Sequence, residues 1–319
     1  MHKKGIPRDA FFCYTHFLIP CVKHLISQKH MNTENTLKLV ECPRDAMQGI
    51  HEFIPTALKA AYINLLLKAG FDTLDFGSFV SSKAIPQMQD TKDVLEKLDL
   101  SSTSTKLLAI AANLRGAEEA VACPEISYVG FPFSISETFQ HRNTNSSMLA
   151  SLNTVDQILE LCDRHQKTAV IYLSMGFGNP YGDPYSFDIV GEWASSLAGL
   201  GTKILSLADT TGVSTAEQIR ILMPMLQKQF PDIECGLHLH STPEKRIEKI
   251  TAAYESGCRR FDSALRGFGG CPMAKDDLTG NIATEELLAF LESRKESTGI
   301  DDYYWNEALQ LSTEVFSYN

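Results

Sequence analysis

The sequence places two histidines, His238 and His240, on either side of a single residue in a short run that is otherwise apolar. In an extended segment, residues i and i+2 point to the same face, so both imidazoles would reach one point in space. Imidazole nitrogen is a common ligand of divalent metal ions. The pair is therefore a candidate for half of a metal site, and two alternatives stay open: a hydrogen-bonded structural pair and a surface coincidence.

Oxygen ligands to complete such a site are available at Asp45 and Asn281, which would offer a carboxylate and an amide carbonyl. Two nitrogen and two oxygen ligands suit an octahedral Mg²⁺ or Mn²⁺ ion with open positions better than a closed structural zinc site. A substrate needs such open positions. The alternatives are that Asp45 caps a short helix and that Asn281 is a turn residue beside Gly280.

Two further side chains could act in catalysis. Arg44 adjoins Asp45, and its planar guanidinium could stabilise an oxygen on which negative charge develops; the alternative is a salt bridge with Glu41 or Asp75. Cys271 belongs to the stretch GFGGCP at 267–272, in which three of the first four residues are glycine. We expect a mobile tip there, with an exposed and reactive thiol. A tight turn with an incidental thiol is the alternative.

The elements that must position these residues alternate along the chain. Short β-type apolar runs are followed by longer amphipathic stretches, a pattern typical of βαβ units and a parallel sheet. The predicted strands are Leu37–Cys42, Thr73–Ser78, Lys106–Ala112, Ile126–Phe133, Thr168–Ser174, Lys203–Ala208, Glu234–His240 and Arg259–Leu265. Eight such units match one (β/α)8 barrel. An open doubly wound sheet would carry a Gly-rich turn after the first strand, where this chain has Cys-Pro-Arg-Asp.

Helices are predicted between the strands, and S/T-x-x-E/Q patterns at Thr154 and at Ser214 are interpreted as capping boxes. A last helix at Asp301–Tyr318 should pack outside the barrel through Trp305 and Phe316. The helices predicted between strands include Ala57–Lys68, Thr91–Leu98, Thr154–His165, Ile189–Leu200, Thr215–Lys228 and Glu244–Ser256. The fold class is therefore α/β, a TIM barrel with an extra C-terminal helix, as one domain over 31–319.

A barrel of this kind places its functional residues at the carboxyl ends of its strands. The first strand leads to Arg44 and Asp45, the second holds Asp75 near its end, and the sixth leads to Asp209. The seventh ends in the two histidines, and the eighth leads to the Gly-rich loop. We therefore expect all of these side chains around one mouth.

With these residues assembled, the chain resembles the 3-hydroxy-3-methylglutaryl-CoA (HMG-CoA) lyases, within the wider family of barrel metal lyases and synthases. The resemblance runs from about Leu37 to Glu292. Its specific pieces are PRDAMQ at 43–48, SFVSSKAIPQM at 78–88, SLADTTGV at 206–213, HLH at 238–240, GFGGCP at 267–272 and TGNIATEEL at 279–287. The chain departs from the family pattern at Ser241, where the usual HxHD becomes HLHS, and at His51, where many relatives have lysine.

The resemblance implies metal ligands at Asp45, His238, His240 and Asn281, and catalytic roles for Arg44 and Cys271. It implies cleavage of HMG-CoA to acetyl-CoA and acetoacetate, with Mg²⁺ or Mn²⁺ as cofactor, a role in leucine degradation, and Asp45 or His238 as the base. The residues expected to support the ligands or the substrate are Gln48, Asp75, Asp209 and Glu285. The alternatives are a 2-oxo-acid aldolase or condensing synthase on the same barrel, and a noncatalytic barrel that binds acyl-CoA.

Composition limits the partners. A net charge of −10 argues against nucleic acid, which requires a dense positive face. The apolar run 11–22 is too short to span a membrane, and eight scattered cysteines without a CxxC pair favour a reducing compartment, the cytoplasm. We expect a small acyl-CoA partner and a possible homodimer. Residues 1–30 are interpreted as a leader without fold or function, with Met31 as the true start.

Overall fold

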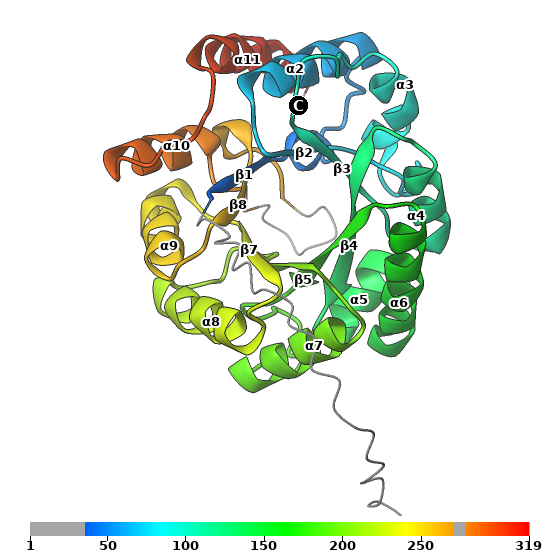
Figure 1. Ribbon diagram of the computed structural model, residues 1–319, viewed down its shortest axis with the longest axis vertical. Coiled ribbons are helices and arrows are strands. Elements are labelled where there is room, and N and C mark those ends of the chain that lie inside the picture. Colours follow the sequence, from blue (N-terminus) through cyan, green and yellow to red (C-terminus); the bar gives the residue numbers. More distant parts are fainter. Residues whose placement is uncertain (1–35, 271–278, 319) are drawn as a thin grey trace, which may run out of the picture. The chain divides into compact units, whose positions relative to one another are not determined.

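The computed structural model describes residues 36–270 and 279–318, and eight parallel strands in this part close into a barrel in sequential order (Figure 1). The expectation for residues 1–30 lies outside the described residues. The strands are β1 (Lys38–Glu41), β2 (Thr73–Ser78), β3 (Lys106–Ile110), β4 (Ile126–Ser134), β5 (Thr168–Ser174), β6 (Ile204–Asp209), β7 (Glu234–Leu239) and β8 (Arg260–Ser263). β1 pairs with β8 and completes the ring. The predicted (β/α)8 architecture is confirmed.

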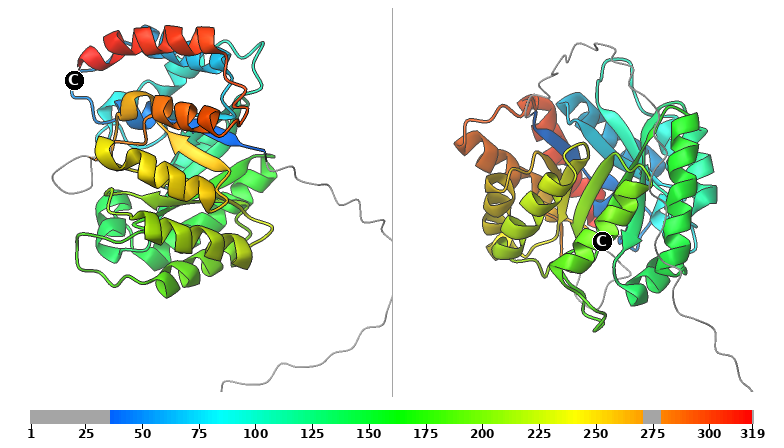
Figure 2. Two further views of the ribbon diagram at one scale, coloured as in Figure 1. Left: turned by 90° about the vertical axis from the view of Figure 1, so that its left-hand side faces the viewer. Right: turned by 60° about the horizontal axis from the view of Figure 1, so that its bottom comes forward.

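Helices cover the outside of the barrel, as Figure 1 shows. They are α2 (Thr56–Ala69), α3 (Thr91–Leu95), α4 (Leu114–Val121), α5 (Glu137–Thr144), α6 (Met148–Arg164), α7 (Phe187–Gly199), α8 (Ala216–Gln229), α9 (Pro243–Glu255), α10 (Thr284–Ser293) and α11 (Asp302–Val315). The short, fully buried helix α1 (Pro43–Met47) instead follows β1 at the end of the barrel. The predicted C-terminal helix is α11, which packs along α2 (Figure 2). Its Trp305 packs edge-on against Phe71, and Phe316 packs against Tyr62. None of the described helices is long and apolar enough to cross a membrane.

Two hydrophobic cores follow from the alternation of side chains along the strands. The outward-facing residues pack against the helices and form the larger core. The inward-facing residues form a smaller core in the barrel interior, made of Leu108, Ile110, Tyr128, Val170, Tyr172 and Ile204. Two residues of this smaller core, Ile110 and Tyr172, line the same cavity as the polar residues at the carboxyl ends of the strands.

Both predicted capping boxes are wrong in position. α6 begins at Met148, because the Ser147 side chain accepts the N–H of Ala150, and Thr154 lies inside the helix with its hydroxyl on the Ala150 carbonyl. The box of α8 is formed one residue later than expected, by Thr215 and Gln218. The sequence STAEQ at 214–218 contains the pattern twice. The N–H of Ser214 is already bound to the Asp209 carboxylate, and the next residue becomes the cap.

Candidate active site

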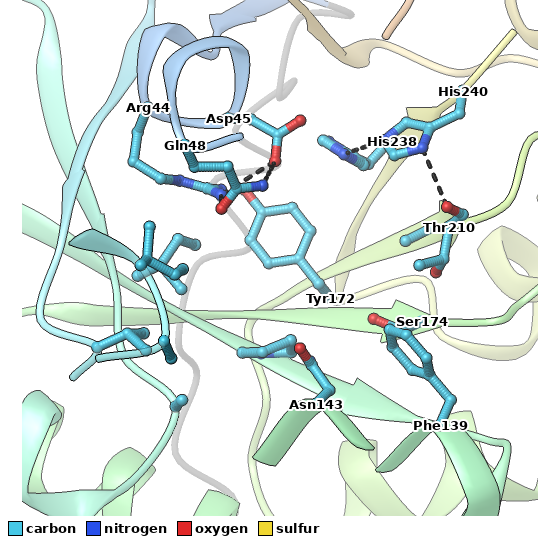
Figure 3. Close-up of a pocket in the computed structure, with 17 residues that line it drawn as sticks. Arg44, Asp45, Gln48, Phe139, Asn143, Tyr172, Ser174, Thr210, His238 and His240 are labelled. Carbon is cyan, nitrogen blue, oxygen red and sulfur yellow. Dashed lines mark hydrogen bonds and ion pairs between the residues drawn. The ribbon is translucent and has the colours of Figure 1, made fainter. Parts of the chain in front are cut away.

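The two histidines converge at the carboxyl end of β7. His238 points into the barrel, His240 follows the last residue of the strand, and their Nε2 atoms lie 3.2 Å apart (Figure 3). His240 donates its Nδ1–H to the carbonyl of Thr210 at 3.1 Å, because a carbonyl can only accept. The Nδ1 of His238 faces a carboxylate oxygen of Asp262 at 3.2 Å. Both Nε2 atoms are thereby left as lone-pair donors directed at the same place.

Asp45 reaches the same place from the end of β1, which is separated from β7 by β8. Pro43 starts the short helix α1 immediately after β1, and this turn carries Asp45 over the end of the barrel. The ligand atoms of Asp45, His238 and His240 all lie within 4.8 Å of one another. The alternative that Asp45 caps a short helix is wrong, because the N-cap position of α1 is Cys42 and the Asp45 carboxylate contacts the side chains of Arg44, Gln48 and Asn281.

Asn281 completes the predicted quartet. Its side-chain nitrogen donates to Asp45 at 2.6 Å and to the carbonyl of Phe268 at 2.8 Å, while its buried Oδ1 has no hydrogen-bond partner among the described atoms. The backbone holds it there, because His240 and Asn281 form an antiparallel bridge and Ser241 donates its N–H to the carbonyl of Gly280. A buried carbonyl oxygen without a partner is costly unless something binds it.

This donor set fits a divalent cation. Adjacent ligands of an octahedral ion, each about 2.0–2.1 Å from the metal, lie about 2.9 Å apart. The separation of 3.2 Å between the two Nε2 atoms is close to that value. Two imidazoles, one carboxylate and one unpartnered amide oxygen suit Mg²⁺ or Mn²⁺. Four residues far apart in sequence thus meet as the sequence predicted.

The charges around the site shift the pKa values of its members. Burial alone would raise the pKa of Asp45, but the positive charges of Arg44, His238 and His240 outweigh it and bring that pKa to about 2. Burial and the neighbouring His238 lower the pKa of His240 to about 4. Burial also acts to lower the pKa of His238, yet the hydrogen bond to Asp262 and its negative charge raise it above 6.5. At neutral pH, Asp45 is ionised and His240 neutral, the states that a metal requires.

Arg44 is only 8% exposed and is fixed on three sides. It forms a two-pronged ion pair with Asp75, donates to Asp45 at 3.0 Å, and donates to the Gln48 carbonyl oxygen at 2.8 Å. The salt bridge with Asp75, which was the alternative to a catalytic role, therefore exists, and Arg44 also lines the cavity. The alternative pairing with Glu41 is wrong, because Glu41 is buried elsewhere and accepts the N–H of Leu265.

The cavity beneath these groups has one polar and one apolar wall. Arg44, Asp45 and the two histidines line it above, and Asn143 and Ser174 face it from the far side (Figure 3). The apolar residues of the wall are Val80, Ala84, Ile85, Ile110, Ala112, Pro132, Phe139 and Ala208. A ligand with an anionic or hydroxylated head and an apolar body matches this lining.

The supporting residues predicted from the sequence differ in whether the structure places them in the site. Gln48 donates to Asp45 at 2.7 Å and belongs to the site. Asp209 does not line the site directly. Its carboxylate accepts from Lys249, which also donates to the His240 carbonyl, and from the N–H of Ser214. Glu285, in the first turn of α10, accepts the N–H of Arg266, and within the described part of the chain it forms no hydrogen bond or ion pair with the four proposed ligands. Cys271 lies outside the described residues.

Three residues of the site were not predicted. Asp262 holds His238, the carbonyl of Thr210 holds His240, and the ring of Tyr172 packs edge-on against His238 with centroids 5.7 Å apart. Asp262 had a usable signal, because it is the only carboxylate within the predicted eighth strand and precedes the Gly-rich loop. The Thr210 contact is made by backbone and leaves no signal in residue type.

Fold and site together indicate an enzyme of the (β/α)8 barrel class with a group of side chains at the barrel mouth that could hold a metal ion. The family model described as HMGL-like matches residues 37–311, and the chain belongs to the HMGL-like family.

Named relatives agree with this assignment. The chain is 33% identical to the cytoplasmic 3-hydroxy-3-methylglutaryl-CoA lyase of Mus musculus, over 85% of this chain and 79% of the relative. It is 35% identical to a 3-hydroxy-3-isohexenylglutaryl-CoA/hydroxy-methylglutaryl-CoA lyase of Pseudomonas aeruginosa, over 85% and 90%. Among solved structures, an HMG-CoA lyase from Acinetobacter baumannii in complex with coenzyme A and 3-methylmalate has a TM-score of 0.80 at 31% identity, covering 89% of this chain and 91% of that one.

Proposed function

We propose that the protein is a divalent-metal-dependent carbon-carbon lyase that cleaves HMG-CoA to acetyl-CoA and acetoacetate. The observation that carries the proposal is the convergence of the two Nε2 atoms, the Asp45 carboxylate and the unpartnered Asn281 oxygen beside the Arg44 guanidinium. The relatives named as lyases of this substrate, and the relative solved with coenzyme A, support the choice of an acyl-CoA.

Asp45, His238, His240 and Asn281 would hold the ion, with Mg²⁺ or Mn²⁺ as the proposed metal. When bound, the ion supplies Lewis-acid stabilisation for the substrate 3-hydroxyl oxygen as its proton leaves. Asp45 and His238 both face the cavity as candidate acceptors for that proton. The apolar wall would pack against the acyl chain and exclude water from the reacting bond.

Arg44 is proposed to stabilise the thioester enolate that forms when the C2–C3 bond breaks. Its ion pair with Asp75 and its bond to Gln48 hold the guanidinium in one orientation, so no reorganisation is needed as charge develops. Cys271 is proposed to help deliver the proton that converts the enolate to acetyl-CoA.

We also propose a place of action and an assembly. The five cysteines described in the structure are all free, which suits a reducing compartment such as the cytoplasm, and the relatives include both cytoplasmic and mitochondrial lyases. For the assembly we propose a homodimer, and for the pathway a role in leucine degradation.

The test is a coupled assay for acetoacetate formed from HMG-CoA, with the purified chain first treated with chelator. Acetoacetate should appear only after Mg²⁺ or Mn²⁺ is restored, and the His240→Ala variant should stay inactive under both conditions. A parallel assay for pyruvate from 4-hydroxy-2-oxo acids tests for an aldolase. Pyruvate release without acetoacetate would contradict the proposed reaction and indicate an aldolase. Metal binding with neither product would indicate a noncatalytic barrel.

A further inference from the structure

A buried lysine lies directly behind the proposed metal site and has no assigned role. Lys249 on α9 is 1% exposed, and its ammonium group reaches back between the ends of two strands. Its Nζ donates to the carbonyl of His240 at 2.7 Å, to a carboxylate oxygen of Asp209 at 2.8 Å and to the carbonyl of Gly212 at 3.0 Å. Three acceptors use all three protons of the ammonium group.

Two of these bonds act on the segment that orients the His240 ring. Thr210, whose carbonyl accepts the Nδ1–H of His240, lies between Asp209 and Gly212, which are both bound to Lys249. The Thr210 hydroxyl also accepts the N–H of Met175, so the segment is tied to the end of β5 as well. The third bond fixes the backbone of His240 itself. The ammonium group of Lys249 thus holds the backbone of His240 directly and its ring through the segment 209–212.

We propose that Lys249 is a positioning residue for metal binding, which holds His240 in the orientation that directs its Nε2 into the site. The proposal rests on the metal site of the proposed function and goes beyond it, because it concerns a side chain that touches neither substrate nor metal. Groups that orient a metal-bound histidine from behind typically contribute 10- to 100-fold to metal affinity.

The chain contains a matched control on another helix of the outer layer, α2 (Figure 1). Lys59 on α2 is buried like Lys249, with 2% of its surface exposed. It pairs with the buried Asp90 at 2.8 Å, the same distance as in the Lys249–Asp209 pair. Its other bond is to the carbonyl of Gln87. Replacing either lysine breaks a buried ion pair and should lower stability strongly. Only one of the two pairs contacts a proposed metal ligand.

The experiment measures Mn²⁺ affinity by titration for the whole chain and for the Lys249→Met, Lys249→Gln and Lys59→Met variants, each below its unfolding temperature. We expect Lys249→Met to bind Mn²⁺ about 10- to 100-fold more weakly. Lys249→Gln, which keeps amide donors, should recover part of that loss and provides a measurement if the methionine variant does not fold. Lys59→Met should lose comparable stability and keep the affinity of the parent.

Unchanged Mn²⁺ affinity in both Lys249 variants would overturn the proposal, as would an equal loss of affinity in Lys59→Met. The measurement is independent of the reaction. A parent chain that binds Mn²⁺ without cleaving HMG-CoA would refute the proposed reaction and leave the role of Lys249 standing, whereas a parent that binds no Mn²⁺ would refute both.

Discussion

Charged side chains gather at both ends of the barrel interior, and the two groups differ in which atoms are left without a partner. At the amino ends of the strands, Lys38 and Arg260 both pair with Glu234. Arg260 leaves two buried donors, Nε and Nη2, without a hydrogen-bond partner among the described atoms. At the carboxyl ends, Asp262, which contacts His238, and Asn281, which contacts Asp45, each leave a buried acceptor, Oδ1, without one.

This difference separates a structural charge cluster from a binding site. The cluster around Arg260 pairs its charges internally, and its guanidinium also lies over the ring of Tyr128. The other end brings two imidazole nitrogens and a carboxylate within 4.8 Å of one another, and the amide of Asn281, whose oxygen has no partner among the described atoms, is bound to that carboxylate; this donor set suits a divalent cation. A residue of the first group should affect stability, and a residue of the second should affect metal binding and activity.

Replacing His240 with alanine should have the largest effect. With one of four ligands removed, we expect a loss of activity of at least about 1,000-fold, because a catalytic metal contributes several kcal/mol to transition-state stabilisation. The measurement is the rate of acetoacetate formation together with Mn²⁺ titration. Activity near that of the parent, without added metal, would contradict the ligand assignment.

Replacing Cys271 with alanine should separate chemistry from metal binding. If the thiol delivers the proton to the enolate, turnover should fall by about 10²- to 10⁴-fold, the usual contribution of a positioned acid or base. Mn²⁺ affinity should stay the same. Turnover equal to that of the parent would remove the thiol from the mechanism.

Replacing Asp262 with asparagine should weaken Mn²⁺ binding about 10- to 100-fold, because it removes the group that orients His238. The pH dependence should also change. The pKa of His238 is raised above 6.5 by Asp262, so in the parent a proton competes with the metal as the pH falls through that raised pKa. In the variant this loss of affinity should move to lower pH. An identical pH profile for parent and variant would show that Asp262 does not act through His238.

The smallest effect should come from the amino end. Lys38→Met removes a half-exposed ion pair with Glu234 and should cost about 0.2–1 kcal/mol of unfolding free energy, as measured by chemical denaturation. Mn²⁺ affinity should equal that of the parent. A change in metal affinity would mean that the two ends of the barrel are coupled, which the comparison above does not predict.

The strands and the grouping of the four proposed metal ligands were predictable from the sequence for one reason. Strand periodicity locates the eight carboxyl ends, and a barrel brings those ends together, so residues such as Asp45 and Asn281 could be assigned to one mouth before any contact was known. The family resemblance supported the same four positions. The structure brings together all four.

The support behind the ligands was not predictable, because it depends on register and on backbone groups. Asp262 faces His238 because β7 and β8 pair these two residues directly, a register that periodicity does not fix. Thr210 acts through its carbonyl, and Lys249 reaches the site from the middle of a helix, where a lysine is ordinarily solvated. The capping errors at Thr154 and Ser214 arose because a short pattern recurs and local competition decides which copy is used.

The most direct test of the metal site is a crystal structure of the chain with Mn²⁺, recorded with anomalous diffraction at the manganese edge. We predict one strong peak at the barrel mouth, about 2.0–2.3 Å from the Nε2 atoms of His238 and His240, a carboxylate oxygen of Asp45 and the Oδ1 of Asn281. A peak elsewhere, or an ion that these four side chains do not share, would contradict the account.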